Sequence, residues 1–240
     1  MNLDVLIFAA HPDDAELSMG GTIVKFTSNH IKVGMIDLTR GELSTRGSAE
    51  TRQKEAFQAA IVLKAAVREN LHLTDGDIYN NKENLMKIIM TIRKYKPKVI
   101  FAPYFNDRHP DHIDTSVLVK RAMFSTGLAK IKTFDKEVSQ EPYRPQKLFY
   151  YMQTYTFEPT FIVDITESFE TKMKAIKCYS TQFHNPKSTE PETFISRPEF
   201  IKYIESRAQF YGFQIGKHFG EPFYCEEKIE YDFGKIFKTD

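Results

Sequence analysis

Short apolar runs alternate with amphipathic stretches of helical length over the first two thirds of the chain, and this alternation is the strongest constraint on its fold. The first run, VLIFAA at residues 5–10, contains no polar residue, as expected for a strand that is covered on both faces. A predicted helix over residues 15–27 follows it. The repeated strand–helix order predicts an α/β fold with a parallel sheet and right-handed crossovers.

The same periodicity assigns the other elements. The further predicted strands are residues 33–38, 70–73, 99–102, 148–152 and 161–165, and the further predicted helices are residues 49–67, 83–95, 111–124, 167–179 and 199–211. No internal repeat or linker divides the sequence. We therefore expect a single domain over residues 1–240, with a Rossmann-like, mostly parallel sheet of order 3-2-1-4-5. Helices should cover both faces of this sheet, and a C-terminal α+β extension should follow it.

Composition excludes several classes of protein. With 33 Lys and Arg against 32 Asp and Glu, the net charge is +1, which lacks the basic excess of a nucleic-acid binder. The 2 cysteines are too few for a disulfide framework or a Cys-rich zinc site. No apolar run approaches the ~18 residues of a membrane span, and the N-terminus lacks the basic region of a signal peptide. We expect a cytoplasmic protein that binds neither nucleic acid nor membrane.

Two related motifs follow strands of the predicted sheet. His11-Pro12-Asp13-Asp14 stands at the C-terminal end of the first strand, and His109-Pro110-Asp111-His112 comes shortly after the fourth. In a sheet of order 3-2-1-4 these two strands are neighbours, and the crevice at that switch point is where such folds bind ligands. The two motifs should therefore meet there. No Gly-x-Gly-x-x-Gly follows the first strand, so a dinucleotide is not the expected ligand.

The residue types in these motifs favour a divalent metal. Zinc accepts imidazole nitrogen and carboxylate oxygen, and a catalytic zinc keeps three protein ligands and one open position. A carboxylate that binds the metal loses basicity, so one of Asp13 and Asp14 should be a ligand and the other a general base. The alternative interpretation is helix capping, because Asp13 with Glu16 fits a capping box and Asp111 could cap the helix that begins there.

Other polar residues favour structural interpretations. The histidines outside the two motifs lie in turns, loops or a short apolar run, where structural or solvent-exposed roles are more common. The segment Asp75-Gly76-Asp77 is predicted to be a turn, for which a sugar contact is an alternative.

Both motifs resemble a known family. AHPDDAE at residues 10–16 and HPDH at residues 109–112 are similar to the paired signatures of the zinc-dependent N-acetylglucosaminyl deacetylases, the PIG-L/LmbE-like family. Other segments resemble its bacillithiol-biosynthesis branch: DLTRGEL at 37–43, TRG at 45–47, Arg52 with Glu55-Ala56, STQF at 180–183, ESRAQFYG at 205–212 and GEPF at 220–223. The likeness covers most of the chain.

The resemblance implies a role for each motif residue. The zinc ligands would be His11, Asp14 and His112. Asp13 would be the general base, and His109, oriented by Asp111, would stabilise the developing oxyanion or donate a proton to the leaving amine. The same donor set also accommodates ferrous iron. The resemblance further implies a homo-oligomer.

The implied substrate is N-acetylglucosaminyl malate, hydrolysed to glucosaminyl malate and acetate. The two malate carboxylates call for arginines, which bind carboxylates in a bidentate manner, and the candidates are Arg52 and Arg108. One alternative is a deacetylase or amidase that acts on another N-acetylglucosamine-containing substrate or on a thiol conjugate. The other is a sugar- or nucleotide-binding module without catalytic activity.

Overall fold

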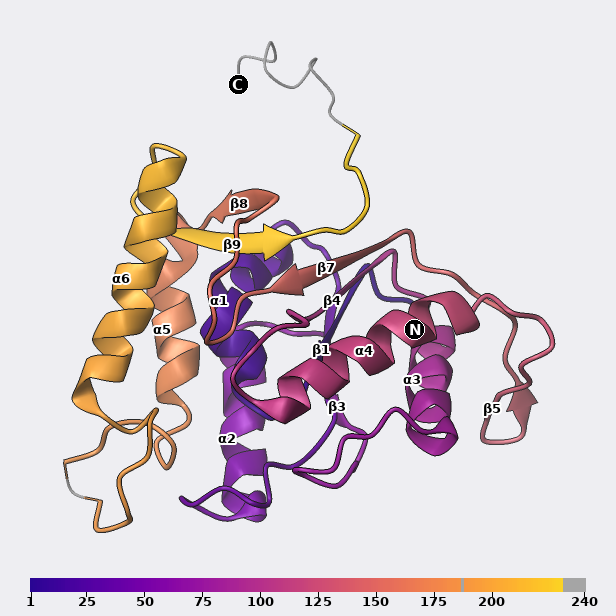
Figure 1. Cartoon of the computed structure of the whole chain (residues 1–240), viewed down its shortest axis with the longest axis horizontal. Helices are drawn as coiled ribbons and strands as arrows, with labels where there is room; N and C mark the ends of the chain where they lie inside the picture. Colours follow the sequence, from indigo (N-terminus) through magenta and orange to yellow (C-terminus); the bar gives the residue numbers. More distant parts are fainter. Residues whose placement is uncertain (187, 231–240) are drawn as a thin grey trace.

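The computed structural model describes residues 1–186 and 188–230 and is organised around one seven-stranded sheet (Figure 1). Its strands are β1 Val5–Ala9, β2 Val33–Asp37, β3 Val67–Asn70, β4 Val99–Pro103, β7 Lys147–Tyr151, β8 Phe161–Asp164 and β9 Gly220–Tyr224. The helices are α1 Asp14–Ser28, α2 Ala49–Val62, α3 Lys82–Tyr95, α4 Pro110–Ser125, the short η1 Thr166–Ser168, α5 Phe169–Lys177 and α6 Pro198–Gln214. A separate hairpin joins β5 Phe134–Asp135 to β6 Val138–Ser139.

The strand order is β3-β2-β1-β4-β7-β9-β8, and the first five strands in this order run parallel. These five strands confirm the predicted α/β fold and the predicted order 3-2-1-4-5. The sheet differs from the prediction at one edge, where β9 pairs antiparallel with both β7 and β8. The extension after β7 therefore lengthens the sheet itself.

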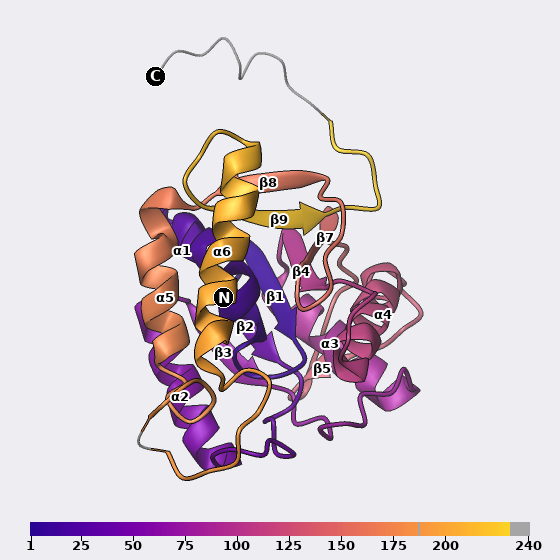
Figure 2. The same ribbon diagram turned by 60° about the vertical axis from the view of Figure 1, so that its left-hand side comes forward.

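Side chains of β1 alternate between two buried layers, as the pleat of a strand requires. Val5 and Ile7 belong to a core shared with α1, α2, α5 and α6, whereas Leu6 and Phe8 belong to a core shared with α3 and α4. The two sets of helices lie on opposite sides of the sheet in both views (Figure 2). The uninterrupted apolar run of β1 is thus explained by burial on both faces.

One predicted boundary is wrong by several residues. The helix predicted over residues 49–67 ends at Val62, because Lys64 adopts a left-handed backbone with a φ of 55° and the Ala65 N–H donates to the Ala60 carbonyl. The next strand consequently begins at Val67 and ends at Asn70, before most of the predicted 70–73 segment. Within the described residues, no helix has both the length and the apolar content needed to cross a bilayer.

Candidate metal centre

The two histidine motifs meet at the carboxyl ends of neighbouring strands. β1 and β4 pair directly, with Val5 opposite Val99, so the loops that leave them start side by side. His11 lies just beyond β1, and His112 lies in the first turn of α4. Their ring centroids are 5.6 Å apart although the residues are separated by 101 positions in sequence. The two motifs therefore meet at the switch point, as the sequence predicts.

Three donor groups converge at this point. Nε2 of His112 lies 3.2 Å from Oδ1 of Asp14, and Nδ1 of His11 lies 3.6 Å from Oδ2 of Asp14. One nitrogen or oxygen from each of these residues lies within 4.8 Å of the others. A tetrahedral ion with bonds of ~2.0–2.1 Å separates its ligand atoms by about 3.3–3.4 Å, so this spacing fits a zinc-sized ion. All three residues are buried.

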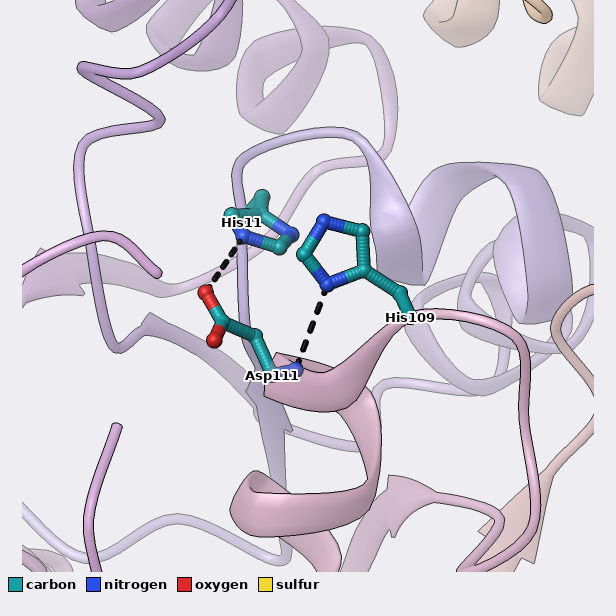
Figure 3. A group of neighbouring side chains, drawn as sticks. All are labelled: His11, His109 and Asp111. Carbon is teal, nitrogen blue, oxygen red and sulfur yellow. Dashed lines mark hydrogen bonds and ion pairs between the residues drawn. The ribbon is translucent and has the colours of Figure 1, made fainter. Parts of the chain in front are cut away.

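A second group, His11, His109 and Asp111, also brings three donors together (Figure 3). In this group the Asp111 backbone N–H donates to Nδ1 of His109 at 3.2 Å, which makes His109 the N-cap of α4. Its Nδ1 lone pair is therefore occupied, and in the neutral ring the proton resides on Nε2. A ring in this state is a hydrogen-bond donor and not a metal ligand, so the set with Asp14 fits an ion better.

The position of Asp111 differs from the prediction. Its carboxylate points to His11, at 3.1 Å from Nε2, and also accepts the Gly76 N–H at 2.8 Å. Asp111 therefore orients His109 through its backbone N–H, while its carboxylate orients His11. The capping role predicted for Asp111 belongs to His109 instead.

Two carboxylates from outside the two motifs contact the histidine rings, a contact that the sequence does not predict. Oδ1 of Asp75 lies 3.0 Å from Nε2 of His11, and Oδ1 of Asp107 lies 2.9 Å from Nδ1 of His112. Metal-binding histidines commonly donate their second ring N–H to such a carboxylate. The turn predicted at residues 75–77 thus supplies one of these groups. The only sequence signal for Asp107 is its place in the polar turn just before the second motif.

Asp13 lies beside the three donors and has a partner of its own. Its Oδ2 accepts a hydrogen bond from Arg52 at 2.7 Å, and Arg52 also donates to the Pro12 carbonyl at 2.9 Å. Asp13 makes no side-chain cap hydrogen bond, so the capping-box interpretation is wrong. Burial raises the pKa of Asp13 to about 7, against the opposing charge of Arg52. The sequence predicts that Arg52 binds a substrate carboxylate, whereas here its guanidinium contacts Asp13.

The charges of the cluster are strongly coupled. Burial alone would lower the pKa of His112, but the carboxylates of Asp14 and Asp107 outweigh it and raise this pKa to about 9. Burial likewise opposes ionisation of Asp14, yet His112 and His11 hold its pKa well below the usual range. Burial and the neighbouring rings of His11 and His112 lower the pKa of His109. A negative carboxylate between two cationic or metal-binding imidazoles is thus the favoured arrangement.

A cavity of about 420 Å³ opens over this cluster. Its lining includes Asp13 and His109 and also side chains from α6 and the segment before it, among them Phe194 and Tyr203. Arg108 also lines the cavity, with its guanidinium carbon 4.5 Å from the centre of the Phe194 ring. Among the described residues no carboxylate lies within ion-pair distance of Arg108. The volume is that of a site for a small organic molecule, for which ~300–1,000 Å³ is typical.

Comparison with known proteins agrees with this geometry. Residues 6–123 match the family model "PIG-L: GlcNAc-PI de-N-acetylase". Diacetylchitobiose deacetylase of Thermococcus kodakarensis is 29% identical over 229 residues, which cover 90% of this chain and 80% of the relative.

Solved structures with a similar fold and about 30% sequence identity are also found. A conserved protein of Thermus thermophilus has a TM-score of 0.85 and 32% identity, with 96% of this chain and 97% of that chain covered. N,N'-diacetylchitobiose deacetylase of Pyrococcus horikoshii has a TM-score of 0.80 and 29% identity, with coverages of 91% and 82%. The chain therefore belongs to the PIG-L family of de-N-acetylases and is a metal-dependent N-deacetylase.

Proposed function

We propose that this protein hydrolyses the N-acetyl group of an N-acetylglucosamine unit in a small saccharide or glycoside, and that zinc is its metal. The observation that carries the proposal is the convergence of His11, Asp14 and His112 beside a second acidic group, Asp13, in the lining of a cavity of about 420 Å³. Two similar deacetylases act on diacetylchitobiose, which supports a saccharide as substrate.

In this proposal His11, Asp14 and His112 hold the zinc ion. Bound zinc would lower the pKa of water toward ~7 and polarise the acyl carbonyl. Asp13 would accept the proton of the attacking water, because its carboxylate faces the cavity and is not needed as a ligand. Arg52 would hold Asp13 in place through its hydrogen bond to Oδ2.

His109 would act on the other side of the reacting carbonyl. Its Nδ1 accepts the Asp111 N–H, so its Nε2–H is available to donate toward the oxygen on which negative charge develops. Either His109 or Asp13 would then deliver a proton to the amine as it leaves.

The second candidate substrate is N-acetylglucosaminyl malate, the bacillithiol precursor that the sequence resemblance implies. Arg108 favours it, because this guanidinium lines the cavity without a carboxylate partner among the described residues. Arg52 also lines the cavity, but its Nε and Nη2 already donate to the Pro12 carbonyl and to Asp13.

The test is a set of deacetylation assays combined with metal analysis. Purified protein with about one equivalent of zinc should release acetate from diacetylchitobiose or from N-acetylglucosaminyl malate, and a chelator should abolish the reaction. If both substrates are inert while zinc is bound, the assignment to N-acetylglucosamine glycosides is wrong. The Arg108→Ala variant separates the two substrates, because it should raise KM for the malate glycoside about tenfold or more and leave KM for diacetylchitobiose within about twofold.

A further inference from the structure

Asp107 is a buried carboxylate that hydrogen-bonds to both histidines of the second motif and to a segment that helps to line the cavity. It lies in the connection between β4 and α4. Its Oδ1 lies 2.9 Å from Nδ1 of His112 and accepts the His109 backbone N–H at 3.2 Å. Its Oδ2 accepts the backbone N–H groups of Thr154 and Tyr155, at 2.7 and 3.1 Å. Every hydrogen-bond partner of this carboxylate is therefore a donor.

The contact with His112 determines which ring nitrogen can bind a metal. An ionised carboxylate only accepts hydrogen bonds, so it requires the ring proton to be on Nδ1. In the neutral ring the lone pair of Nε2 is then free, and Nε2 is the atom that faces Asp14 at 3.2 Å. With the proton on Nε2 instead, His112 could not contribute to the three-donor set.

The contacts with Thr154 and Tyr155 connect the same carboxylate to the substrate cavity. These two residues follow β7, and Thr154 and the neighbouring Gln153 line the cavity. Arg207 of α6 donates to the Gln153 carbonyl, so this segment also contacts the α6 wall. Without Asp107 these two N–H groups would lose their acceptor, which is unfavourable for donors that find no other partner.

We propose that Asp107 is a positioning residue that fixes the metal-binding tautomer of His112 and holds residues 154–155 against the metal centre. The inference rests on the proposed function, because it takes His112 to be a metal ligand. The role follows from three facts: the carboxylate is buried, it contacts a candidate ligand, and it accepts two consecutive backbone N–H groups, of which that of Thr154 belongs to a residue of the cavity lining.

The decisive variant is Asp107→Asn. An amide of the same size has one accepting oxygen in place of two, so either His112 or the 154–155 segment must face an NH₂ group. We expect zinc to bind about 10–100-fold more weakly, which is the usual effect of losing such a partner. Zinc affinity is measured on the full chain by competition with a chromophoric chelator, without any substrate. Asp107→Ser, which leaves room for a water, serves as the second variant if the amide does not fold.

Glu55→Gln is the matched control. Glu55 is also a buried carboxylate that accepts from a loop, at 2.9 Å from the Thr181 N–H and 3.0 Å from the Ser180 hydroxyl. It contacts no histidine among the described residues, so Glu55→Gln should bind zinc as the wild type does. If Asp107→Asn or the folded Asp107→Ser binds zinc as tightly as the wild type, the inference is wrong while the proposed function stands. If the wild type itself binds no zinc, the proposed function is wrong, and the inference about Asp107 is wrong with it.

Discussion

Asp13 and Asp14 are consecutive residues, yet their carboxylates serve different partners. The reason is the backbone at Asp13, where φ is 109° and ψ is −27°. A non-glycine residue in such a conformation costs about 1–3 kcal/mol and is found mainly where function requires it. The turn directs Asp13 toward Arg52 and Asp14 toward the two histidines. This local strain is what allows one short motif to supply both a ligand and a separate acidic group.

The division of roles between these aspartates can be tested with two variants. Asp13→Asn should keep its zinc and lose about 10²–10⁴-fold in kcat, because a base is removed while all three ligands remain. His112→Ala should lose zinc, because it removes one of the three donors. Elemental analysis of both purified proteins and initial acetate-release rates give the answer. An empty Asp13→Asn protein beside a zinc-loaded His112→Ala protein would reverse our assignment.

Helix α1, which carries Asp14, is interrupted soon after the site. Met19 has a non-helical backbone with a φ of −139°, and this break comes just before Gly21 and Thr22. Glu221 of β9 accepts the backbone N–H groups of both, at 3.0 and 2.7 Å, and also bonds to the buried ammonium of Lys172 at 2.7 Å. The carboxylate therefore joins α1, α5 and β9, and it fixes the second half of α1 on the sheet.

We expect Glu221→Gln to lower the free energy of unfolding by about 3–5 kcal/mol, because it leaves the fully buried Lys172 without a counter-charge. The control is Arg197→Gln, which removes an exposed ion pair with Glu192 and should cost less than about 1 kcal/mol. Urea denaturation followed by circular dichroism measures both. Equal midpoints for the two variants would show that the buried pair contributes little to stability.

The contrast between β1 and β9 explains how far the sequence predicts the elements. β1 is a run of apolar residues because it is buried on both faces, and that composition identifies it directly. β9 contains Glu221 and Pro222, so its sequence does not have a strand pattern, although four of its five residues are buried. Its glutamate is buried only because donors from α1 and α5 surround it. These donors come from distant parts of the chain, so the hydrophobic pattern around residue 221 cannot reveal that the glutamate is buried.

The candidate site likewise has contacts that the sequence predicts and contacts that it does not. The meeting of His11 with His112 is predictable, because it follows from strand order and from the ends of two parallel strands. The contacts of Asp107 and Asp75 with the histidine rings are not predictable, because each depends on the conformation of an irregular loop. The partner of Arg52 escapes prediction for a related reason: Gly41, with a φ of 65°, has no side chain, and a Cβ there would lie 2.8 Å from the guanidinium. The absent side chain at Gly41 leaves room for the guanidinium that contacts Asp13.

At the scale of the whole molecule, the candidate metal centre connects parts of the chain that otherwise meet only through the sheet. His11 belongs to the loop after β1, and His112 belongs to α4 on the opposite side of the sheet from α1. Asp75 and Asp107 bring in two further loops. An ion bound here would hold four segments together, whereas the unfolded chain would not keep these groups near one another.

Metal binding should therefore stabilise the folded chain. A ligand that binds only the folded state adds about 2.7 kcal/mol when its free concentration is a hundred times its Kd. For a chain of this size, each kcal/mol raises Tm by about 2–4 °C, so zinc at that concentration should raise Tm by roughly 5–10 °C over the chelator-treated protein. Differential scanning calorimetry with and without zinc measures the shift. In His112→Ala the shift should disappear, since the ion loses a ligand that joins α4 to the rest of the centre. A shift of the same size in that variant would place the stabilising ion elsewhere in the molecule.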